Sequence, residues 1–103
     1  MNGISFRLKR MLASYKDGQK CSHLELVQPV EATGDGCQEC LEIGDRWVHL
    51  RQCLVCGQVG CCDSSKNKHA SRHYVLTGHP LIRSLEPGED WRWCYIDQVL
   101  LEG

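Results

Sequence analysis

Residues 49–73 read HLRQCLVCGQVGCCDSSKNKHASRH, with four cysteines and three histidines in one short stretch. Thiolates and imidazoles are ligands that zinc prefers, so this density is typical of a metal site. The stretch could form one zinc finger, contribute to a larger set of metal sites, or hold a reactive redox thiol. The spacing of the other cysteines and histidines helps to decide between these possibilities.

The whole chain has the size and charge of one small domain. It has 103 residues, 12 basic and 13 acidic side chains, and a formal net charge of -1. This balance gives no general reason to expect a nucleic-acid partner. A domain of this size has a small core and benefits from cross-links, which its eight cysteines and five histidines can supply through metal ions.

No targeting or membrane segment is expected. No apolar run approaches the roughly 20 residues of a membrane span. Charges interrupt every apolar stretch of MNGISFRLKRMLASYKDGQK, residues 1–20, which argues against a secretory signal. We therefore expect a cytoplasmic chain, in which thiols stay reduced. Cysteines that are paired as C-x-x-C and mixed with histidines then indicate metal binding rather than disulfides.

The first segment predicts an amphipathic helix, so we divide the chain into a helical extension, residues 1–19, and a metal-rich domain, residues 20–103. We expect this helix to dock on its own domain; the alternative is a basic helix that binds a membrane or a partner. Its apolar residues recur at helical spacing on one stripe: Ile4, Leu8, Met11, Leu12 and Tyr15.

The metal-rich domain predicts short strands and one helix. The helix covers residues 63–78, with Ser64 or Ser65 as its N-terminal cap and Gly78 as its C-terminal cap. Apolar patterns and turn residues predict the strands around it. These cover residues 46–56, 57–62 (a strand or turn), 79–88 and 90–101, the last bending into a terminal helical turn.

The candidate ligands outnumber those of one zinc site. Two C-x-x-C pairs, Cys37/Cys40 and Cys53/Cys56, can each supply two ligands from one tight turn. Zinc takes four ligands in a tetrahedron, so the twelve candidates suffice in number for three sites. The other eight candidates are Cys21, His23, Cys61, Cys62, His69, His73, His79 and Cys94.

One spacing fits a DNA-reading finger. The run from Cys53 to His73 matches C-x2-C-x12-H-x3-H. Such a finger needs apolar residues between its ligands, but Gly60 and Lys66 stand where they should lie, and two further cysteines would be unused. We interpret this spacing as a coincidence.

The motifs CSH, CQEC, CLVCGQVGCC, HASRH, TGHPL and WCY follow one another in this order. Over residues 20–100 the chain therefore resembles the UBP-type zinc finger, a ubiquitin-binding module attached to some deubiquitinases and deacetylases. As a free-standing domain it looks like the bacterial version, in a setting that usually offers no ubiquitin. The resemblance implies an α+β fold, with a small twisted antiparallel sheet, one main helix and one to three zinc ions.

The resemblance also implies how the ligands group. His69 and His73 are one helical turn apart, so spacing alone would place them on one zinc, but the resemblance assigns them to different ions. The implied sites are Cys37, Cys40, Cys61 and His69; then Cys53, Cys56, His73 and His79; then Cys21, His23 and Cys94, with Asp97 where the family often has a cysteine.

The third of these sites leaves the zinc count at two or three. Asp97 can bind zinc through oxygen, and we expect three ions on that basis. The alternative is a lost site, with Cys21 and Cys94 as buried thiols. Closed sites with four protein ligands do no chemistry, so we expect no enzyme activity.

Cys62 is the one cysteine that these sites leave unused. It falls near the start of the predicted helix, where the helix dipole favours a reactive thiolate, although Asp63 beside it opposes this. The simpler interpretation is a small packed side chain, because the sequence shows no base to activate the thiol.

The resemblance implies a binding pocket as well. In this family the C-terminal Gly-Gly tail of ubiquitin enters a narrow pocket with aromatic walls, and an arginine helps to bind the tail. Trp93 and Tyr95 match the aromatic wall. Asp63 replaces the family arginine, Arg51 a tryptophan and Leu100 a tyrosine. An aspartate repels a terminal carboxylate, which argues against ubiquitin as the ligand.

We therefore expect a non-catalytic zinc domain that binds a protein or peptide, for example a C-terminal tail. Trp93 and Tyr95 would form the binding face, and Arg51, Asp63 and Arg92 would set its specificity. One alternative is a nucleic-acid-binding or regulatory zinc protein whose basic N-terminal helix contacts phosphates. The other is a redox sensor that uses the spare thiol.

Overall fold

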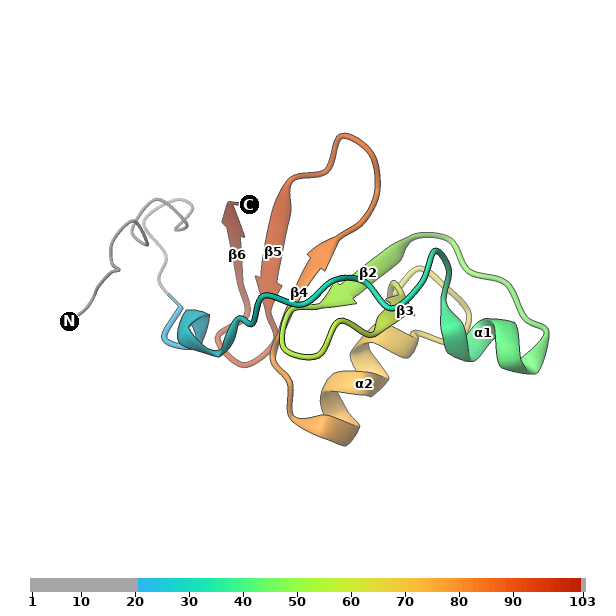
Figure 1. Cartoon of the computed structure of the whole chain (residues 1–103), viewed down its shortest axis with the longest axis horizontal. Coiled ribbons are helices and arrows are strands. Elements are labelled where there is room, and N and C mark those ends of the chain that lie inside the picture. The colour runs from blue at the N-terminus through green and yellow to red at the C-terminus, as the bar shows by residue number, and fades with distance from the viewer. Residues whose placement is uncertain (1–20, 103) are drawn as a thin grey trace.

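The structure, a computed structural model, describes residues 21–102, so the helix predicted in residues 1–19 lies outside the described part. The central element is a five-stranded antiparallel sheet in the order β3-β2-β4-β5-β6 (Figure 1). No helix in the described residues is long and apolar enough to cross a membrane. The elements are η2 (Leu24–Leu26), α1 (Gln38–Ile43), β2 (Leu50–Cys53), β3 (Val59–Cys61), α2 (His69–Thr77), β4 (Leu81–Ser84), β5 (Trp91–Cys94) and β6 (Val99–Glu102).

The strand register separates two faces of the sheet. Ile82 of β4 lies opposite Trp93 of β5, and Arg51 of β2 lies on the same face by the same alternation. The α2 helix covers the β3 end of this face. There Gly60 approaches the helix so closely that a Cβ on it would lie 2.8 Å from the Ala70 nitrogen. The part of this face over β4 and β5 is not covered by α2, and a surface pocket lies there.

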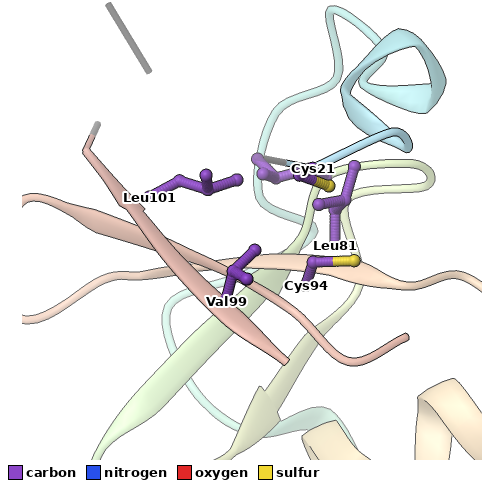
Figure 2. Close-up of a cluster of buried hydrophobic side chains, with 6 residues drawn as sticks. Cys21, Leu81, Cys94, Val99 and Leu101 are labelled. Atoms are coloured by element: carbon purple, nitrogen blue, oxygen red, sulfur yellow. The ribbon is translucent and has the colours of Figure 1, made fainter. Parts of the chain in front are cut away.

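The opposite face of the sheet holds the main hydrophobic core (Figure 2). Leu24 and Val27, from the segment that precedes α1, pack against this core. The same segment is tied to the sheet by a backbone hydrogen bond from the Gln28 amide to the Leu54 carbonyl, 2.9 Å long. The buried members of the core are Cys21, Leu54, Leu81, Cys94, Val99 and Leu101.

The predicted α+β class is confirmed, since one antiparallel sheet is combined with one main helix, α2. The short helix α1, which the sequence analysis did not predict, follows directly on Cys37. It ends at Gly44, which has a left-handed conformation with φ 73°. The helix places Cys37 and Cys40 one turn apart, on the side that faces β3.

The single last strand predicted over residues 90–101 is wrong. The chain forms two strands there, β5 and β6, which pair as an antiparallel hairpin. The reversal is closed by a 2.8 Å hydrogen bond from the Gln98 amide to the Cys94 carbonyl, and Gln98 takes a positive φ of 54°. A four-residue turn without glycine or proline gives no clear sequence signal, which explains the error.

The predicted start of the main helix is also wrong. The helix begins at His69, after Lys68, which caps it in a left-handed conformation without a side-chain hydrogen bond. Ser65 does not cap it, because its hydroxyl accepts a 2.8 Å hydrogen bond from the Val48 amide instead. The predicted end is confirmed, since Gly78 caps the helix with φ 79°.

Candidate metal centres and the adjacent pocket

Three clusters of cysteine, histidine and aspartate side chains stand out in the described residues. In each cluster the four donor atoms lie within 4.8 Å of one another. A tetrahedral zinc with Zn–S about 2.3 Å and Zn–N about 2.0 Å has S···N edges of about 3.5 Å and S···S edges of about 3.8 Å. The clusters are Cys37, Cys40, Cys61 and His69 (first); Cys53, Cys56, His73 and His79 (second); and Cys21, His23, Cys94 and Asp97 (third).

The first cluster joins α1, β3 and the start of α2. Nδ1 of His69 lies 3.2 Å from Sγ of Cys37, 3.3 Å from Sγ of Cys40 and 3.6 Å from Sγ of Cys61. The Cys40 and Cys61 sulfurs are 3.9 Å apart. All four residues are buried. These distances fit the edges of a zinc tetrahedron, and the donor set of three sulfurs and one nitrogen fits structural zinc.

The second cluster joins β2, the turn after it, the middle of α2 and the segment that follows α2. Sγ of Cys53 lies 3.6 Å from Nδ1 of His79, and Sγ of Cys56 lies 3.4 Å from Nε2 of His73. The turn that presents the cysteines is closed by a 2.8 Å hydrogen bond from the Gly57 amide to the Cys53 carbonyl. Two sulfurs and two nitrogens at these distances also fit zinc.

The third cluster joins Cys21 and His23, just before η2, to the end of β5 and the β5–β6 turn. Nδ1 of His23 lies 3.5 Å from Sγ of Cys94, 3.9 Å from Sγ of Cys21 and 3.0 Å from Oδ2 of Asp97. The same Asp97 oxygen accepts a 3.1 Å hydrogen bond from the Ser22 amide. The aspartate therefore lies where a fourth ligand is needed, and its oxygen is a donor that zinc accepts.

Burial disfavours the charged thiolate form of the cysteines in these clusters unless a cation lies close to them. Burial, together with the neighbouring thiols Cys94 and Cys40, raises the pKa of Cys21 and of Cys37 respectively, in each case to about 12. Such thiols stay protonated at neutral pH unless a positive charge compensates the thiolate. Zinc supplies that charge and displaces the protons, so these residues fit the metal that their spacing indicates.

The structure separates His69 and His73 as the resemblance implies, although they lie on consecutive turns of α2. His69 is the first residue of α2, and its amide donates a 3.2 Å hydrogen bond to Sγ of Cys61 at the end of β3. His69 faces its cluster with Nδ1, whereas His73 faces the second cluster with Nε2. The ring centre of His73 lies 5.3 Å from that of His79. Two tetrahedra on the same helix are possible because each ring reaches toward a different C-x-x-C pair.

A pocket of about 250 Å³ lies on the α2 face of the sheet, beside but outside the metal clusters. Trp93, Tyr95, Arg51 and Asp63, which the sequence analysis singled out, all line it. None of the twelve cluster residues does. The full lining is Arg51, Cys62, Asp63, Ser64, Ile82, Trp91, Trp93, Tyr95 and Leu100.

Arg92, the fifth residue predicted for the binding face, does not line the pocket. On β5 it alternates with Trp91 and Trp93, and it lies opposite Arg83 and Leu101. Its side chain is therefore on the core face of the sheet. Side chains of a strand alternate between its two faces, so the WRW motif predicts that Trp91 and Trp93 share one face and that Arg92 lies on the other. This pattern could have added Trp91 to the predicted binding face, from which it was missing.

Arg51 is held rigidly at one side of the pocket. Its Nη1 donates to the Leu50 carbonyl at 3.0 Å and to the Ser84 hydroxyl at 3.1 Å, and lies 3.6 Å from Oε1 of Glu89. The guanidinium carbon lies 4.6 Å from the centre of the Trp91 ring, so the cation stacks on the indole. Only 12% of the Arg51 side chain is exposed.

Asp63 is held at another side of the pocket by side chains of α2 and the β5–β6 turn. The Ser71 hydroxyl donates to Oδ1 of Asp63 at 2.5 Å and lies 3.2 Å from the Tyr95 hydroxyl. Tyr95 in turn stacks on Tyr74, with 4.8 Å between the ring centres. Burial raises the pKa of Tyr95, so its hydroxyl stays protonated at neutral pH and remains a hydrogen-bond donor.

The structure corrects the prediction that Cys62 lies at a helix N-terminus, since α2 begins only at His69. Cys62 is buried, with Sγ 3.6 Å from the Ser65 hydroxyl. Burial by itself raises the pKa of this thiol. Hydrogen bonds with Ser65 and with the backbone at His49, together with the charge of Arg51, outweigh burial and lower the pKa to about 7. His49 belongs to none of the three clusters.

A small sheet with one main helix and cysteine–histidine clusters is the architecture of a zinc-finger domain. The chain belongs to the family described as "Zn-finger in ubiquitin-hydrolases and other protein", whose profile matches residues 37–102. Its structure is similar to the solution NMR structure of protein RPA1320 from Rhodopseudomonas palustris, with a TM-score of 0.75 and 50% sequence identity over 82% of each chain. None of the curated proteins compared matches the chain significantly. The expected family is thus confirmed, and the structure brings together three clusters that are each close enough to hold a zinc ion.

Proposed function

We propose that this chain is a non-catalytic zinc-binding module that binds a peptide, such as the C-terminal tail of a partner protein, in the pocket beside Trp93 and Tyr95. The observation that carries this proposal is the pocket itself. It is a concave site of about 250 Å³ with aromatic walls and two oppositely charged side chains, Arg51 and Asp63. A mostly apolar cavity with a few placed polar groups is typical of a binding site.

The three metal clusters support a structural role for zinc rather than catalysis. Each cluster would hold one ion with four protein ligands and leave no open position for a substrate. The ions would cross-link segments that few apolar contacts hold together. Each structural zinc contributes on the order of 10 kcal/mol to the free energy of folding. The first ion would tie α1, β3 and α2, and the third would tie the segment around Cys21 to the β5–β6 turn.

Arg51 supports recognition of a terminal carboxylate despite the loss of the family arginine at position 63. In the described part of the chain, all its polar contacts fall on Nη1. Nε and Nη2 therefore keep their donors for a ligand. The stacking on Trp91 holds the guanidinium plane in place. A carboxylate on such a pre-oriented guanidinium forms short, charge-assisted hydrogen bonds.

The experiment is a titration of the zinc-loaded protein with a peptide that ends in Leu-Arg-Gly-Gly, followed by backbone amide NMR shifts. We expect saturable shifts around Trp93 and Tyr95 that disappear when the peptide is C-terminally amidated. Trp93→Ala should weaken binding at least about tenfold, because aromatic residues in a binding pocket contribute much of the affinity. Leu76→Ala, an exposed position on α2, is the control and should change nothing.

The proposal would be contradicted if neither this peptide nor other peptides with a free C-terminus changed the backbone amide NMR shifts. The nucleic-acid alternative depends on the basic segment within residues 1–20, which lies outside the described part. Binding to duplex DNA with a steep salt dependence would favour it. The cytoplasmic location stays a prediction.

Cys62 supports a second candidate function, a redox-sensing thiol, because it lines the pocket and its pKa is lowered to about 7. The test is alkylation of the zinc-loaded protein with iodoacetamide at pH 7, with the modified residue located by peptide mass spectrometry. Modification of Cys62 alone would support this candidate. No modification of Cys62 would exclude it.

A further inference from the structure

The sulfur of Cys40, in the first metal cluster, receives a hydrogen bond from a side chain. Nδ2 of Asn67 donates to this sulfur at 3.7 Å. The other two sulfurs of the cluster receive hydrogen bonds from the backbone. The amide of His69 donates to Sγ of Cys61 at 3.2 Å, and the backbone at Cys40 donates to Cys37. A substitution can therefore remove the donor at Cys40, whereas the backbone donors do not depend on a side chain.

Asp45 holds the amide of Asn67 in this orientation. Oδ2 of Asp45 accepts a 2.9 Å hydrogen bond from the same nitrogen, and Nζ of Lys66 lies 3.5 Å from that oxygen. The hydrogen bond from Asn67 is the main cause that lowers the pKa of Asp45, so its carboxylate stays ionised at neutral pH. An ionised carboxylate accepts hydrogen bonds and donates none. Asp45 therefore also decides that the nitrogen of the amide, rather than its oxygen, faces Cys40.

The first cluster needs such donors because it concentrates negative charge. Three thiolates around one divalent zinc leave a net negative charge, and all four ligands are buried away from water. The Arg46 carbonyl lies 3.5 Å from Sγ of Cys40 but brings no hydrogen to a thiolate. The half-buried Asn67 amide supplies one. Hydrogen bonds to a metal ligand fix its orientation and tune its strength as a donor.

We propose that Asn67 is a positioning residue of the first metal centre, whose amide, aimed by Asp45, donates to the Cys40 thiolate and keeps this sulfur on the zinc ion. Groups that hydrogen-bond metal ligands typically change metal affinity by about ten- to a hundredfold. The proposal is independent of the proposed peptide binding, because neither Asn67 nor Asp45 lines the pocket.

The experiment compares the full chain with Asn67→Asp, which keeps the size of the side chain and removes its N–H donor. Cadmium replaces zinc, and cadmium NMR gives a resonance for each occupied cluster, the first being recognised by its three sulfur ligands. We expect this resonance to shift and the resonances of the other clusters to stay. Chelator competition on the zinc-loaded protein should show a loss of affinity of about tenfold or more at the first cluster.

A swap of the two residues separates the contact with sulfur from the contact between Asn67 and Asp45. Asn67→Asp combined with Asp45→Asn exchanges amide and carboxylate, so the two side chains can still hydrogen-bond, but Cys40 meets a carboxylate. We expect this double variant to keep the lowered affinity and the shifted resonance. Asn67→Leu removes the donor without adding charge and should show a smaller loss. Gln38→Ala removes an exposed amide of α1 beside Cys37 and should not change the affinity.

The outcomes decide whether Asn67 acts on one sulfur. A shift confined to the first resonance, with lowered affinity in the single and double variants, would support the proposal. Parental affinity in the double variant would overturn it, because the contact between the two side chains would then carry the effect. An unchanged resonance and affinity in Asn67→Asp would overturn it as well. So would loss of every resonance in both Asn67→Asp and Asn67→Leu, which would assign Asn67 to the fold as a whole.

Discussion

The first metal cluster has four buried ligands, whereas the third combines two buried cysteines with His23 and Asp97, whose side chains are 23% and 27% exposed. The formal charges are equal. Three thiolates, or two thiolates and a carboxylate, each place three negative charges around a divalent ion. The two clusters therefore differ in the type of one donor and in access to water. Both differences weaken the third site, because a carboxylate is a harder ligand than a thiolate and exposed ligands are open to competing protons and chelators.

The two clusters also hold different parts of the fold. The first joins α1, β3 and α2, which few apolar residues otherwise connect, since its own buried core is little more than the ligands themselves. The third shares Cys21 and Cys94 with the main core, where the apolar side chains of Leu81, Val99 and Leu101 also pack. We therefore expect the first ion to be permanent and the third to exchange.

The largest effect is expected for Cys61→Ser, which removes a fully buried ligand of the first cluster. A structural zinc contributes on the order of 10 kcal/mol, about as much as the whole stability of a small domain, so this variant should not fold cooperatively. Native mass spectrometry and thermal unfolding followed by circular dichroism would show it. A variant that holds three zinc ions and melts within a few degrees of the parent would contradict the structural role of this cluster.

A smaller effect is expected for Asp97→Ala. The variant should lose one zinc ion and keep two, because only the third cluster uses this carboxylate. The free energy of unfolding should fall by about 2–4 kcal/mol, since the sheet and the other clusters remain. Zinc content and urea unfolding measure both. Three ions bound by Asp97→Ala would show that water replaces the aspartate or that it is not a ligand.

The order of zinc release sharpens the same comparison. With excess chelator at neutral pH, we expect the third ion to leave first, seen as early NMR shifts of Ser22 and Cys94, and the first ion to leave last. Asp97→Cys replaces the oxygen donor by sulfur and should slow the first release step by about tenfold or more. Simultaneous release of all ions would indicate that the clusters are not independent.

The smallest effect is expected for Cys62→Ser, the neighbour of Cys61 and its matched control. Cys62 belongs to none of the clusters in residues 21–102, and a serine hydroxyl can keep the hydrogen bond with Ser65. The zinc content should not change, and stability should change by less than about 1 kcal/mol. A lost zinc ion would instead make Cys62 a ligand.

Much of the metal chemistry could be predicted from residue types and local spacing. A C-x-x-C pair brings two sulfurs together within one turn, whatever the rest of the fold does, so Cys37/Cys40 and Cys53/Cys56 were predictable as units. The Gly78 cap was predictable for the same reason, because a left-handed residue after a helix favours glycine wherever it occurs.

Other features depended on contacts between distant residues. Ser65 was a reasonable helix cap by local rules, but its hydroxyl instead accepts a hydrogen bond from the amide of Val48, 17 positions away. The β5–β6 turn had no glycine or proline, and its conformation at Gln98 accompanies the pairing of the two strands. Local preference is weak compared with long-range packing, so such boundaries are predicted poorly.

The sequence by itself determined that this chain binds metal and which side chains are available to do so, because ligand chemistry belongs to each residue and the C-x-x-C turn is local. Only the tertiary structure decided the pocket. The pairing of β2, β4 and β5 places Arg51 on Trp91 and turns Arg92 to the other face, while α2 brings Ser71 to Asp63. The physical reason is that a strand alternates its side chains with a period of two, and which side faces a pocket depends on what packs against the opposite face.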